Sequence, residues 1–185
     1  MRVSAGLQSS SSGLSLTGSV LLLGGARSGK SRYAEALLAN ANPRTYIATA
    51  EAGDAEMVER IRLHREQRGP GWVTREAPLD LPAAIRAESG VLLVDCLTLW
   101  LSNLMEQEHD IDGATEALCA AIQRPGGPVV LVSNEVGLGI VPESSLARAF
   151  RDHAGRLHQH VAAVADRVIF IAAGLPLALK GELPK

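Results

Sequence analysis

The chain has 185 residues and a formal net charge of −2, which suits one ordinary domain and gives no positive surplus for non-specific nucleic-acid binding. Hydrophobic residues make up 46% of the chain, enough for a full core, whereas Phe, Tyr and Trp occur only twice each. Two cysteines are too few for a disulfide framework, and the longest apolar runs are too short to span a bilayer. We therefore expect a globular cytoplasmic protein with no membrane span and no nucleic-acid partner.

The first residues differ in composition from the rest. Six of the twelve residues 8–19 are Ser, with Gly13 and Gly18 among them, and the apolar segment of a signal peptide is missing. We therefore expect residues 1–18 to be a flexible tail and residues 19–185 to form one folded domain. The tail is interpreted as an inert extension, with control by phosphorylation as the alternative.

From residue 20 onward, short apolar runs alternate with segments of helical periodicity. The apolar runs cover residues 20–23, 45–49, 91–94, 129–133 and 168–173. Runs without alternating polarity are typical of strands covered on both faces, as in a parallel sheet. Helices are expected over residues 31–40, 54–68, 83–87, 112–123 and 144–167. The pattern predicts an α/β domain with a mainly parallel sheet flanked by helices; residues 175–185 are a weaker strand candidate because Pro176 and Pro184 interrupt them.

The strand expected at residues 20–23 leads into a glycine-rich loop and then a helix. The loop matches the phosphate-binding pattern G-x-x-x-x-G-K-[ST] through Gly24, Gly25, Ala26, Arg27, Ser28, Gly29, Lys30 and Ser31. Glycines let the backbone curl, so that N–H groups and the helix N-terminus converge on phosphate oxygens. In such loops the lysine, here Lys30, reaches the β- and γ-phosphates, and the Ser31 hydroxyl is placed for Mg²⁺. The domain of residues 19–185 is thus expected to bind a nucleoside triphosphate.

Another apolar strand, residues 91–94, ends in a carboxylate, Asp95. A carboxylate at the carboxyl edge of a parallel sheet lies beside the phosphate loop, where it can hold Mg²⁺. Many strands end in Asp, so the metal role is favoured only in combination with the loop. A regulatory GTPase is disfavoured, because the sequence contains no Asn-Lys-x-Asp motif for guanine.

The helix expected at residues 54–68 carries a histidine among arginines. Its residues Met57, Ile61, His64 and Arg68 are spaced by four, three and four positions, so they share one face. One interpretation is an amphipathic helix with a buried histidine. The alternative is a nucleophile, because nearby guanidinium groups disfavour the imidazolium and keep a nitrogen lone pair free to attack phosphorus.

Five segments, in order along the chain, resemble those of one enzyme family. They are residues 24–32, residues 46–49, Arg60-Ile61-x-x-His64-Arg65-x-x-Arg68, Asp95-Cys96-Leu97-Thr98-Leu99-Trp100-x-x-Asn103-Leu104, and Val132-Ser133-Asn134-Glu135-Val136-Gly137-x-Gly139-Ile140-Val141-Pro142. From about Val20 to about Lys180, the chain is similar to the bifunctional adenosylcobinamide kinase/adenosylcobinamide-phosphate guanylyltransferases of cobalamin biosynthesis. The resemblance implies a P-loop NTPase (RecA-like) domain that assembles as a homotrimer.

The resemblance also implies two activities, with GTP, ATP and Mg²⁺ as cofactors. The γ-phosphate of ATP or GTP passes to the aminopropanol hydroxyl of adenosylcobinamide; GTP then guanylylates a histidine, and GMP passes to adenosylcobinamide-phosphate to give adenosylcobinamide-GDP. By motif position, His64 carries GMP, Lys30 is the catalytic lysine, and Ser31 and Asp95 hold the metal. Beyond the phosphate loop, the family's nucleotide contacts match Thr49, Ala50, Glu51, Arg65, Glu66, Gln67, Arg68, Glu76 and Asp95.

Two positions depart from the family pattern. His158 stands where the family commonly has Asn before Gln159, and Gly69 separates Arg68 from Pro70, where Pro usually follows Arg directly. We expect His158 and His160 to be surface or interface residues, and we assign no zinc site to the histidines.

Two other functions stay open on the sequence. One is a single-function P-loop kinase of a small alcohol or nucleotide, in which His64 is structural. The other is a non-enzymatic, nucleotide-gated binding module. Neither needs a histidine among arginines at residues 60–68, so this segment favours the bifunctional enzyme.

Overall fold

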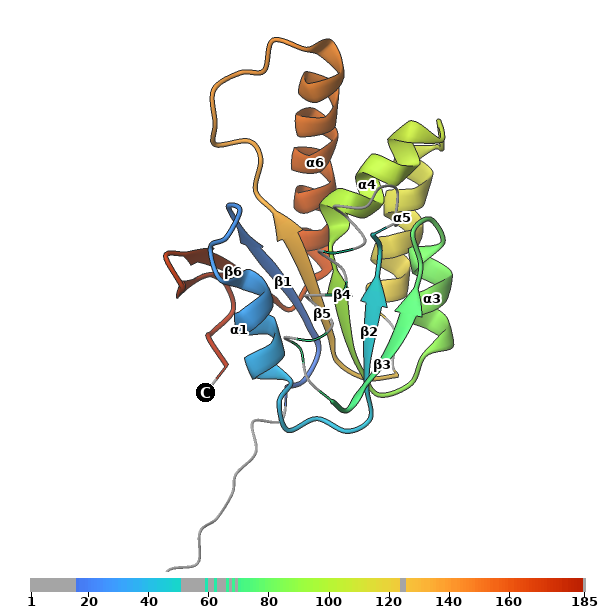
Figure 1. The fold of residues 1–185 in the computed structure, drawn as a ribbon, viewed down its shortest axis with the longest axis vertical. Coiled ribbons are helices and arrows are strands. Elements are labelled where there is room, and N and C mark those ends of the chain that lie inside the picture. The colour runs from blue at the N-terminus through green and yellow to red at the C-terminus, as the bar shows by residue number, and fades with distance from the viewer. Residues whose placement is uncertain are drawn as a thin grey trace, which may run out of the picture.

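The computed structural model describes residues 16–50, 59, 62, 66, 68, 70–123 and 126–184, and a seven-stranded sheet forms their centre (Figure 1). The strands are β1 Ser19–Gly24, β2 Arg44–Ala48, β3 Trp72–Glu76, β4 Val91–Asp95, β5 Val129–Asn134, β6 Arg167–Ala172 and β7 Leu175–Lys180. They lie in the order β3-β2-β4-β5-β1-β6-β7, and all neighbouring pairs are parallel except β6 and β7. The expected α/β architecture with a mainly parallel sheet is confirmed.

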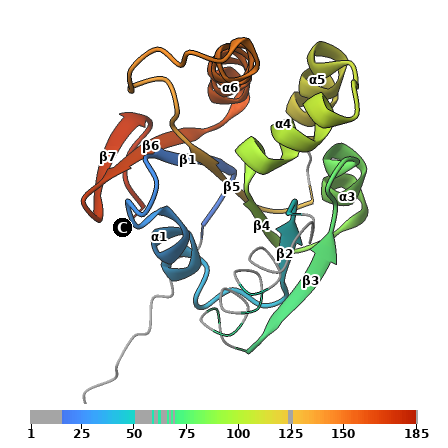
Figure 2. The same cartoon turned by 45° about the horizontal axis from the view of Figure 1, so that its top comes forward.

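Helices cover both faces of this sheet. One face carries α1 Lys30–Leu37, and the other carries α3 Leu81–Ala87, α4 Leu97–Glu106, α5 Ile111–Ile122 and α6 Ser145–Val164 (Figure 2). Alternate residues of β1 serve the two sides: Leu21 packs in the cluster beneath α3 to α6, and Leu22 packs in the cluster beneath α1. Burial on both faces explains why a central strand such as β1 is a continuous apolar run.

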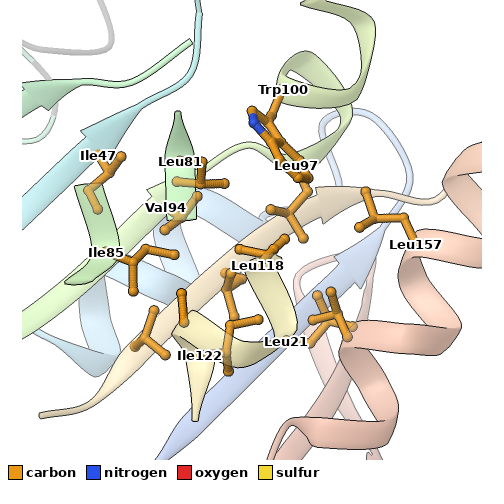
Figure 3. Close-up of a cluster of buried hydrophobic side chains, with 14 of the residues drawn as sticks. Leu21, Ile47, Leu81, Ile85, Val94, Leu97, Trp100, Leu118, Ile122 and Leu157 are labelled. Atoms are coloured by element: carbon orange, nitrogen blue, oxygen red, sulfur yellow. The ribbon is translucent and has the colours of Figure 1, made fainter. Parts of the chain in front are cut away.

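The larger cluster fixes the four-helix layer to the sheet (Figure 3). Ile47 and Val94 of the sheet are fully buried in it together with Leu118 of α5. Trp100 of α4 is also fully buried, and its indole Nε1 donates a hydrogen bond of 2.7 Å to the Leu79 carbonyl. The aromatic ring therefore fills the core while its polar atom is satisfied.

Two elements, β3 and α4, are not among the expected ones, and two expected helices end several residues earlier. The helix expected over residues 31–40 ends at Leu37. The side chains of β3 are half-buried or exposed, so this strand contains no continuous apolar run. The residues of α4 belong to a family motif, and their sequence pattern gives no separate expectation of a helix. The helix expected over residues 144–167 ends at Val164, because Arg167 already begins β6.

The weak strand candidate at the C-terminal end forms β7. It pairs antiparallel with β6 at the edge of the sheet, with Pro176 opposite Ile171. An edge strand tolerates proline because one side of its backbone has no strand to pair with. The edge position therefore resolves the conflict between the apolar pattern and the prolines.

The start of the described chain is attached to the domain. Leu16 packs against the cluster beneath α1, the Thr17 carbonyl accepts a hydrogen bond of 2.8 Å from Arg167 Nη1, and the Gly18 carbonyl accepts one from the Val129 amide. The rest of the expected tail, residues 1–15, lies outside the described residues. Within the described part of the chain, no helix combines the length and the apolar character needed to cross a membrane.

Candidate active site

The carboxyl ends of the parallel strands bring the polar candidates to one edge of the sheet. In the strand register, Gly24 lies opposite Asn134, and Ala48 lies between Asp95 and Glu76. The phosphate loop follows Gly24 and the predicted metal ligand is Asp95, so both lie at this edge. This is where ligands bind in open parallel sheets.

The backbone of the loop requires glycine at two of the motif's fixed positions. Gly24 has φ +153°, and a Cβ there would lie 2.3 Å from the Ile171 carbonyl oxygen. Gly29 has φ +101°, and its Cβ would lie 3.3 Å from the Cα of Gly174. Any other residue would combine a strained backbone with a close contact, so these glycines give the loop its curled shape.

The loop and the start of α1 form a cradle suited to an anion. Lys30 is 6% exposed, and its Nζ donates a hydrogen bond of 2.7 Å to the Gly25 carbonyl, so the ammonium group folds back over the loop. Burial lowers the pKa of Lys30. The Ser28 hydroxyl is buried and finds no hydrogen-bond partner among the described residues. A helix N-terminus, a buried lysine and an unsatisfied hydroxyl together fit a phosphate group.

The Asp95 carboxylate receives two hydroxyl donors on one oxygen. Ser31 Oγ lies 3.4 Å and Tyr46 Oη lies 3.1 Å from Asp95 Oδ2. Carboxylate and hydroxyl oxygens are ligands that Mg²⁺ accepts, with nucleotide phosphates and waters completing its shell, so Ser31 and Asp95 fit the expected metal. In the described part of the chain, no group of three or more His, Cys, Asp or Glu side chains is placed to hold a metal ion.

Tyr46 is a site residue that the sequence reasoning missed. It is 6% exposed, and burial foremost, with the neighbouring Asp95 charge, raises the pKa of its phenol far above the usual range. The hydroxyl therefore stays protonated and donates to the carboxylate. The sequence signals are a tyrosine in an apolar strand and its place in the family segment of residues 46–49; neither identifies its acceptor, because that depends on which strand lies next to it.

Arg68 lies on the other side of this tyrosine. Its guanidinium carbon is 3.5 Å from the centre of the Tyr46 ring, and its Nη2 donates a hydrogen bond of 3.3 Å to Thr74 Oγ1 on β3. Arg68 is 9% exposed. Arg68, which is expected to contact the nucleotide, therefore lies against the ring of Tyr46, whose hydroxyl donates to Asp95.

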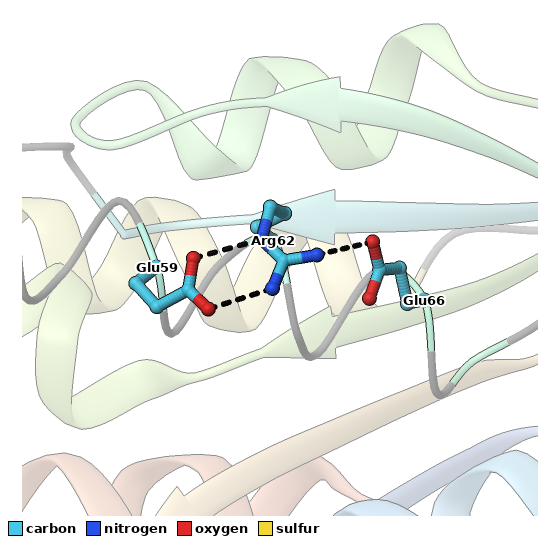
Figure 4. A network of polar contacts seen from close by, with 3 residues as sticks. All are labelled: Glu59, Arg62 and Glu66. Atoms are coloured by element: carbon cyan, nitrogen blue, oxygen red, sulfur yellow. Dashed lines mark hydrogen bonds and ion pairs between the residues drawn. The ribbon is translucent and has the colours of Figure 1, made fainter.

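Three described residues of the same helical segment form a surface network (Figure 4). Arg62 Nε and Nη2 donate to the two carboxylate oxygens of Glu59 at 2.7 and 2.6 Å, and its Nη1 donates to Glu66. All three side chains are more than half exposed. Glu66, an expected nucleotide contact, is therefore paired with Arg62 in this structure.

The remaining described candidates have different surroundings. Thr49 is fully buried, and its hydroxyl donates to the Cys96 carbonyl at 2.8 Å and accepts from the Cys96 amide at 2.9 Å. That hydroxyl ties the end of β2 to the end of β4. Ala50 is half-buried, and Glu76 is exposed as the last residue of β3.

Four expected site residues lie outside the described residues: Glu51, His64, Arg65 and Gln67. They stay predictions, and His64 is the most important of them, because the guanylyl-transfer hypothesis depends on it.

The expectation that His158 is a surface or interface residue is wrong. His158 is 7% exposed, because it follows Leu157 on the stripe of α6 that faces the sheet. Its Nε2 lies 2.7 Å from Ser133 Oγ, and its Nδ1 lies 3.6 Å from Glu135 Oε2. Burial lowers the pKa of His158, although Glu135 opposes the shift. The histidine thus joins α6 to the end of β5, next to the phosphate-loop strand, whereas His160 is exposed as expected.

Comparison with a family model gives a match over residues 20–179, and the family is described as cobinamide kinase / cobinamide phosphate guanyltransferase. The chain is 52% identical over 168 residues to the bifunctional adenosylcobalamin biosynthesis protein CobP of Pseudomonas aeruginosa, covering 88% of this chain and 97% of that protein. It is 43% identical over 179 residues to the bifunctional adenosylcobalamin biosynthesis protein CobU of Salmonella typhimurium, covering 87% of this chain and 99% of that protein.

Solved structures support the fold at much lower sequence identity. An ATPase from the type III secretion system of pathogenic bacteria aligns with a TM-score of 0.53 at 12% identity, over 90% of this chain and 59% of the ATPase. Protein PH0250 of Pyrococcus horikoshii OT3 aligns with a TM-score of 0.56 at 9% identity, over 92% of this chain and 90% of that protein. The chain therefore has the P-loop NTPase fold.

Proposed function

The chain belongs to the cobinamide kinase and cobinamide phosphate guanyltransferase family, and from that premise we propose a bifunctional enzyme of cobalamin biosynthesis. It phosphorylates adenosylcobinamide and then transfers GMP from GTP to the product, which yields adenosylcobinamide-GDP. The observation that carries this proposal is the family match over residues 20–179, because it spans the phosphate loop, Asp95 and His64 together.

For phosphoryl transfer, the loop holds the triphosphate of ATP or GTP. The amides of the loop and the N-terminus of α1 bind phosphate oxygens, and Lys30 neutralises charge that develops on the transferred phosphoryl group. Ser31 and Asp95 offer oxygens to Mg²⁺, which when bound offsets charge on the β- and γ-phosphates. The aminopropanol hydroxyl of adenosylcobinamide attacks the γ-phosphorus, and the nucleoside diphosphate leaves.

For guanylyl transfer, we propose His64 as the nucleophile. The neutral imidazole attacks the α-phosphorus of GTP, a P–N bond forms, and pyrophosphate leaves. The phosphate of adenosylcobinamide-phosphate then attacks the same phosphorus and displaces the histidine. The buried guanidinium of Arg68, stacked on the Tyr46 ring that binds Asp95, supports a role in neutralising phosphate charge at this site.

Intact-mass spectrometry of the purified protein, after incubation with GTP and Mg²⁺, tests the covalent step. The expected result is one added GMP that acid removes, as a P–N bond requires, and that maps to His64. A protein that binds GTP and forms no adduct would instead be a single-function kinase. Phosphorylation of adenosylcobinamide is followed in parallel with ATP and with GTP as donor.

Three further properties stay predictions: a homotrimeric assembly, which the family resemblance implies; dependence on Mg²⁺, which Ser31 and Asp95 indicate; and a cytoplasmic location, which the composition indicates. The first is checked by light scattering of the purified protein in solution. The second is checked by measuring both transfers in Mg²⁺ and in EDTA.

A further inference from the structure

Tyr46 occupies the middle of β2, between the strand that ends in Asp95 and the edge strand β3. A buried phenol hydroxyl needs a hydrogen-bond acceptor, and the acceptor here is Asp95 Oδ2 at 3.1 Å. Ser31 Oγ, 3.4 Å away, donates to the same oxygen. Two donors from different elements, α1 and β2, restrict rotation of the carboxylate about its Cβ–Cγ bond.

The same ring contacts a positive charge on its face. The guanidinium carbon of Arg68 lies 3.5 Å from the ring centre, and the Trp72 ring meets Tyr46 edge-on at 6.3 Å. A hydroxyl that donates to a carboxylate makes its ring richer in electrons, which strengthens the attraction to a cation on the face. Contacts therefore run from Ser31 through Asp95 and Tyr46 to Arg68, which follows His64 by four positions in the sequence.

We propose that Tyr46 is a positioning residue that holds the Asp95 carboxylate in the orientation required by the Mg²⁺–nucleotide complex. This inference rests on the proposed function, since both transfers begin with a nucleoside triphosphate bound at the phosphate loop. Because one carboxylate serves both transfers, Tyr46 influences both through Asp95. A purely structural tyrosine would contribute only ring packing, which phenylalanine also provides.

The first test compares Tyr46→Phe with a matched control, Tyr33→Phe. Tyr33, the only other tyrosine, lies on α1 and packs against the same cluster as Tyr46. GTP affinity is measured by calorimetry in Mg²⁺ and in EDTA. Loss of a hydrogen bond to a charged group predicts about tenfold weaker binding in Mg²⁺ for Tyr46→Phe and little change in EDTA. If the two variants bind GTP alike in Mg²⁺, the proposal is overturned.

A double-mutant cycle with Asp95→Asn tests whether Tyr46 acts through Asp95. In the Asp95→Asn background, adding Tyr46→Phe should cause no further loss of GTP binding in Mg²⁺. A full additive loss would mean that Tyr46 acts elsewhere, which also overturns the proposal.

The kinetic counterpart is a fall in kcat of both transfers by the same factor in Tyr46→Phe. A fall in only one transfer would contradict the shared role of the carboxylate. If the unaltered protein catalyses neither transfer, the proposed function fails, whereas the Mg²⁺ dependence of GTP binding still decides the role of Tyr46.

Discussion

The centre of the sheet and its edge strand β3 both contribute to the candidate site, but they differ in burial and in the number of strands that pair with them. Every residue of β1, which leads into the phosphate loop, is buried, and strands pair with it on both sides. The edge strand β3 pairs only with β2, and its Val73 is 50% exposed. Of the two regions, the centre leads into the phosphate loop, and the edge is hydrogen-bonded to Arg68, four positions after the expected nucleophile His64 in the sequence.

Because phosphate binding and guanylyl transfer depend on different regions of the molecule, we expect mutations to separate them. Buried strands with neighbours on both sides open only at a high free-energy cost, whereas edge elements with exposed side chains open more readily. Changes at the centre should therefore affect nucleotide binding and with it both transfers. Loss of the expected nucleophile His64 should affect guanylyl transfer alone.

His64→Ala gives the largest and most selective expected effect. Without the nucleophile no P–N bond forms, so the GMP adduct and adenosylcobinamide-GDP should be abolished while phosphorylation of adenosylcobinamide continues. Intact-mass spectrometry measures the GMP adduct. Product chromatography measures adenosylcobinamide-GDP and the phosphorylated adenosylcobinamide. His160→Ala, an exposed histidine on α6, is the matched control and should keep both activities. Retention of GMP transfer in His64→Ala would remove His64 from the mechanism.

Lys30→Ala tests the phosphate loop, which follows the central strand β1. Loss of a preorganised cation over the phosphate loop should lower both transfer rates by about 10²–10³-fold. Initial rates of both reactions with saturating GTP measure the change. Lys180→Ala is the control, because its ammonium group binds the Ala162 and Ala163 carbonyls away from the loop. A loss confined to one reaction would contradict a shared phosphate site.

A pair of truncations compares the stability of the two regions directly. Leu131 in β5 is fully buried, so Leu131→Ala should lower the free energy of unfolding by about 2–5 kcal/mol. Val73 in β3 is half exposed, so Val73→Ala should cost less than about 1 kcal/mol. Urea denaturation followed by circular dichroism measures both, and equal losses would break the comparison.

His158 gives the central region a pH dependence. Burial holds its pKa below the ordinary value of 6.5, so below that pH the unfolded chain takes up a proton that the folded protein does not. Stability should therefore be complete above about pH 6.5 and fall by up to about 1.4 kcal/mol per pH unit below it, until the folded imidazole also titrates. His158→Asn should reduce this slope in denaturation curves between pH 5 and 8. An unchanged slope would show that His158 does not titrate as its burial requires.

Arg62→Ala should have the smallest effect. The contacts of Arg62 with Glu59 and Glu66 are exposed, and water and salt screen such pairs. The urea midpoint should match that of the unaltered protein within error. A clear shift would show that this surface network supports the edge more than its exposure implies.

Much of the fold could be predicted because its signals are local. Residues 20–23 and 91–94 are apolar on both faces, as β1 and β4 confirm, and the loop pattern specifies its own backbone. The edge strand β3 could not be predicted, because its partly exposed side chains do not form a continuous apolar run. His158 was misplaced because the buried stripe of α6 includes a polar position whose partner, Ser133, lies on another element.

The phosphate loop, the candidate nucleophile and the family could be identified from the sequence, because they depend on residue type and short spacing. The contacts of Tyr46 with Asp95, 49 positions away, and of Ser133 with His158, 25 positions away, became visible in the folded chain alone. Such pairings follow from strand order and from which helix covers which face. Local patterns leave both unspecified, since one apolar strand can take any central place in a parallel sheet.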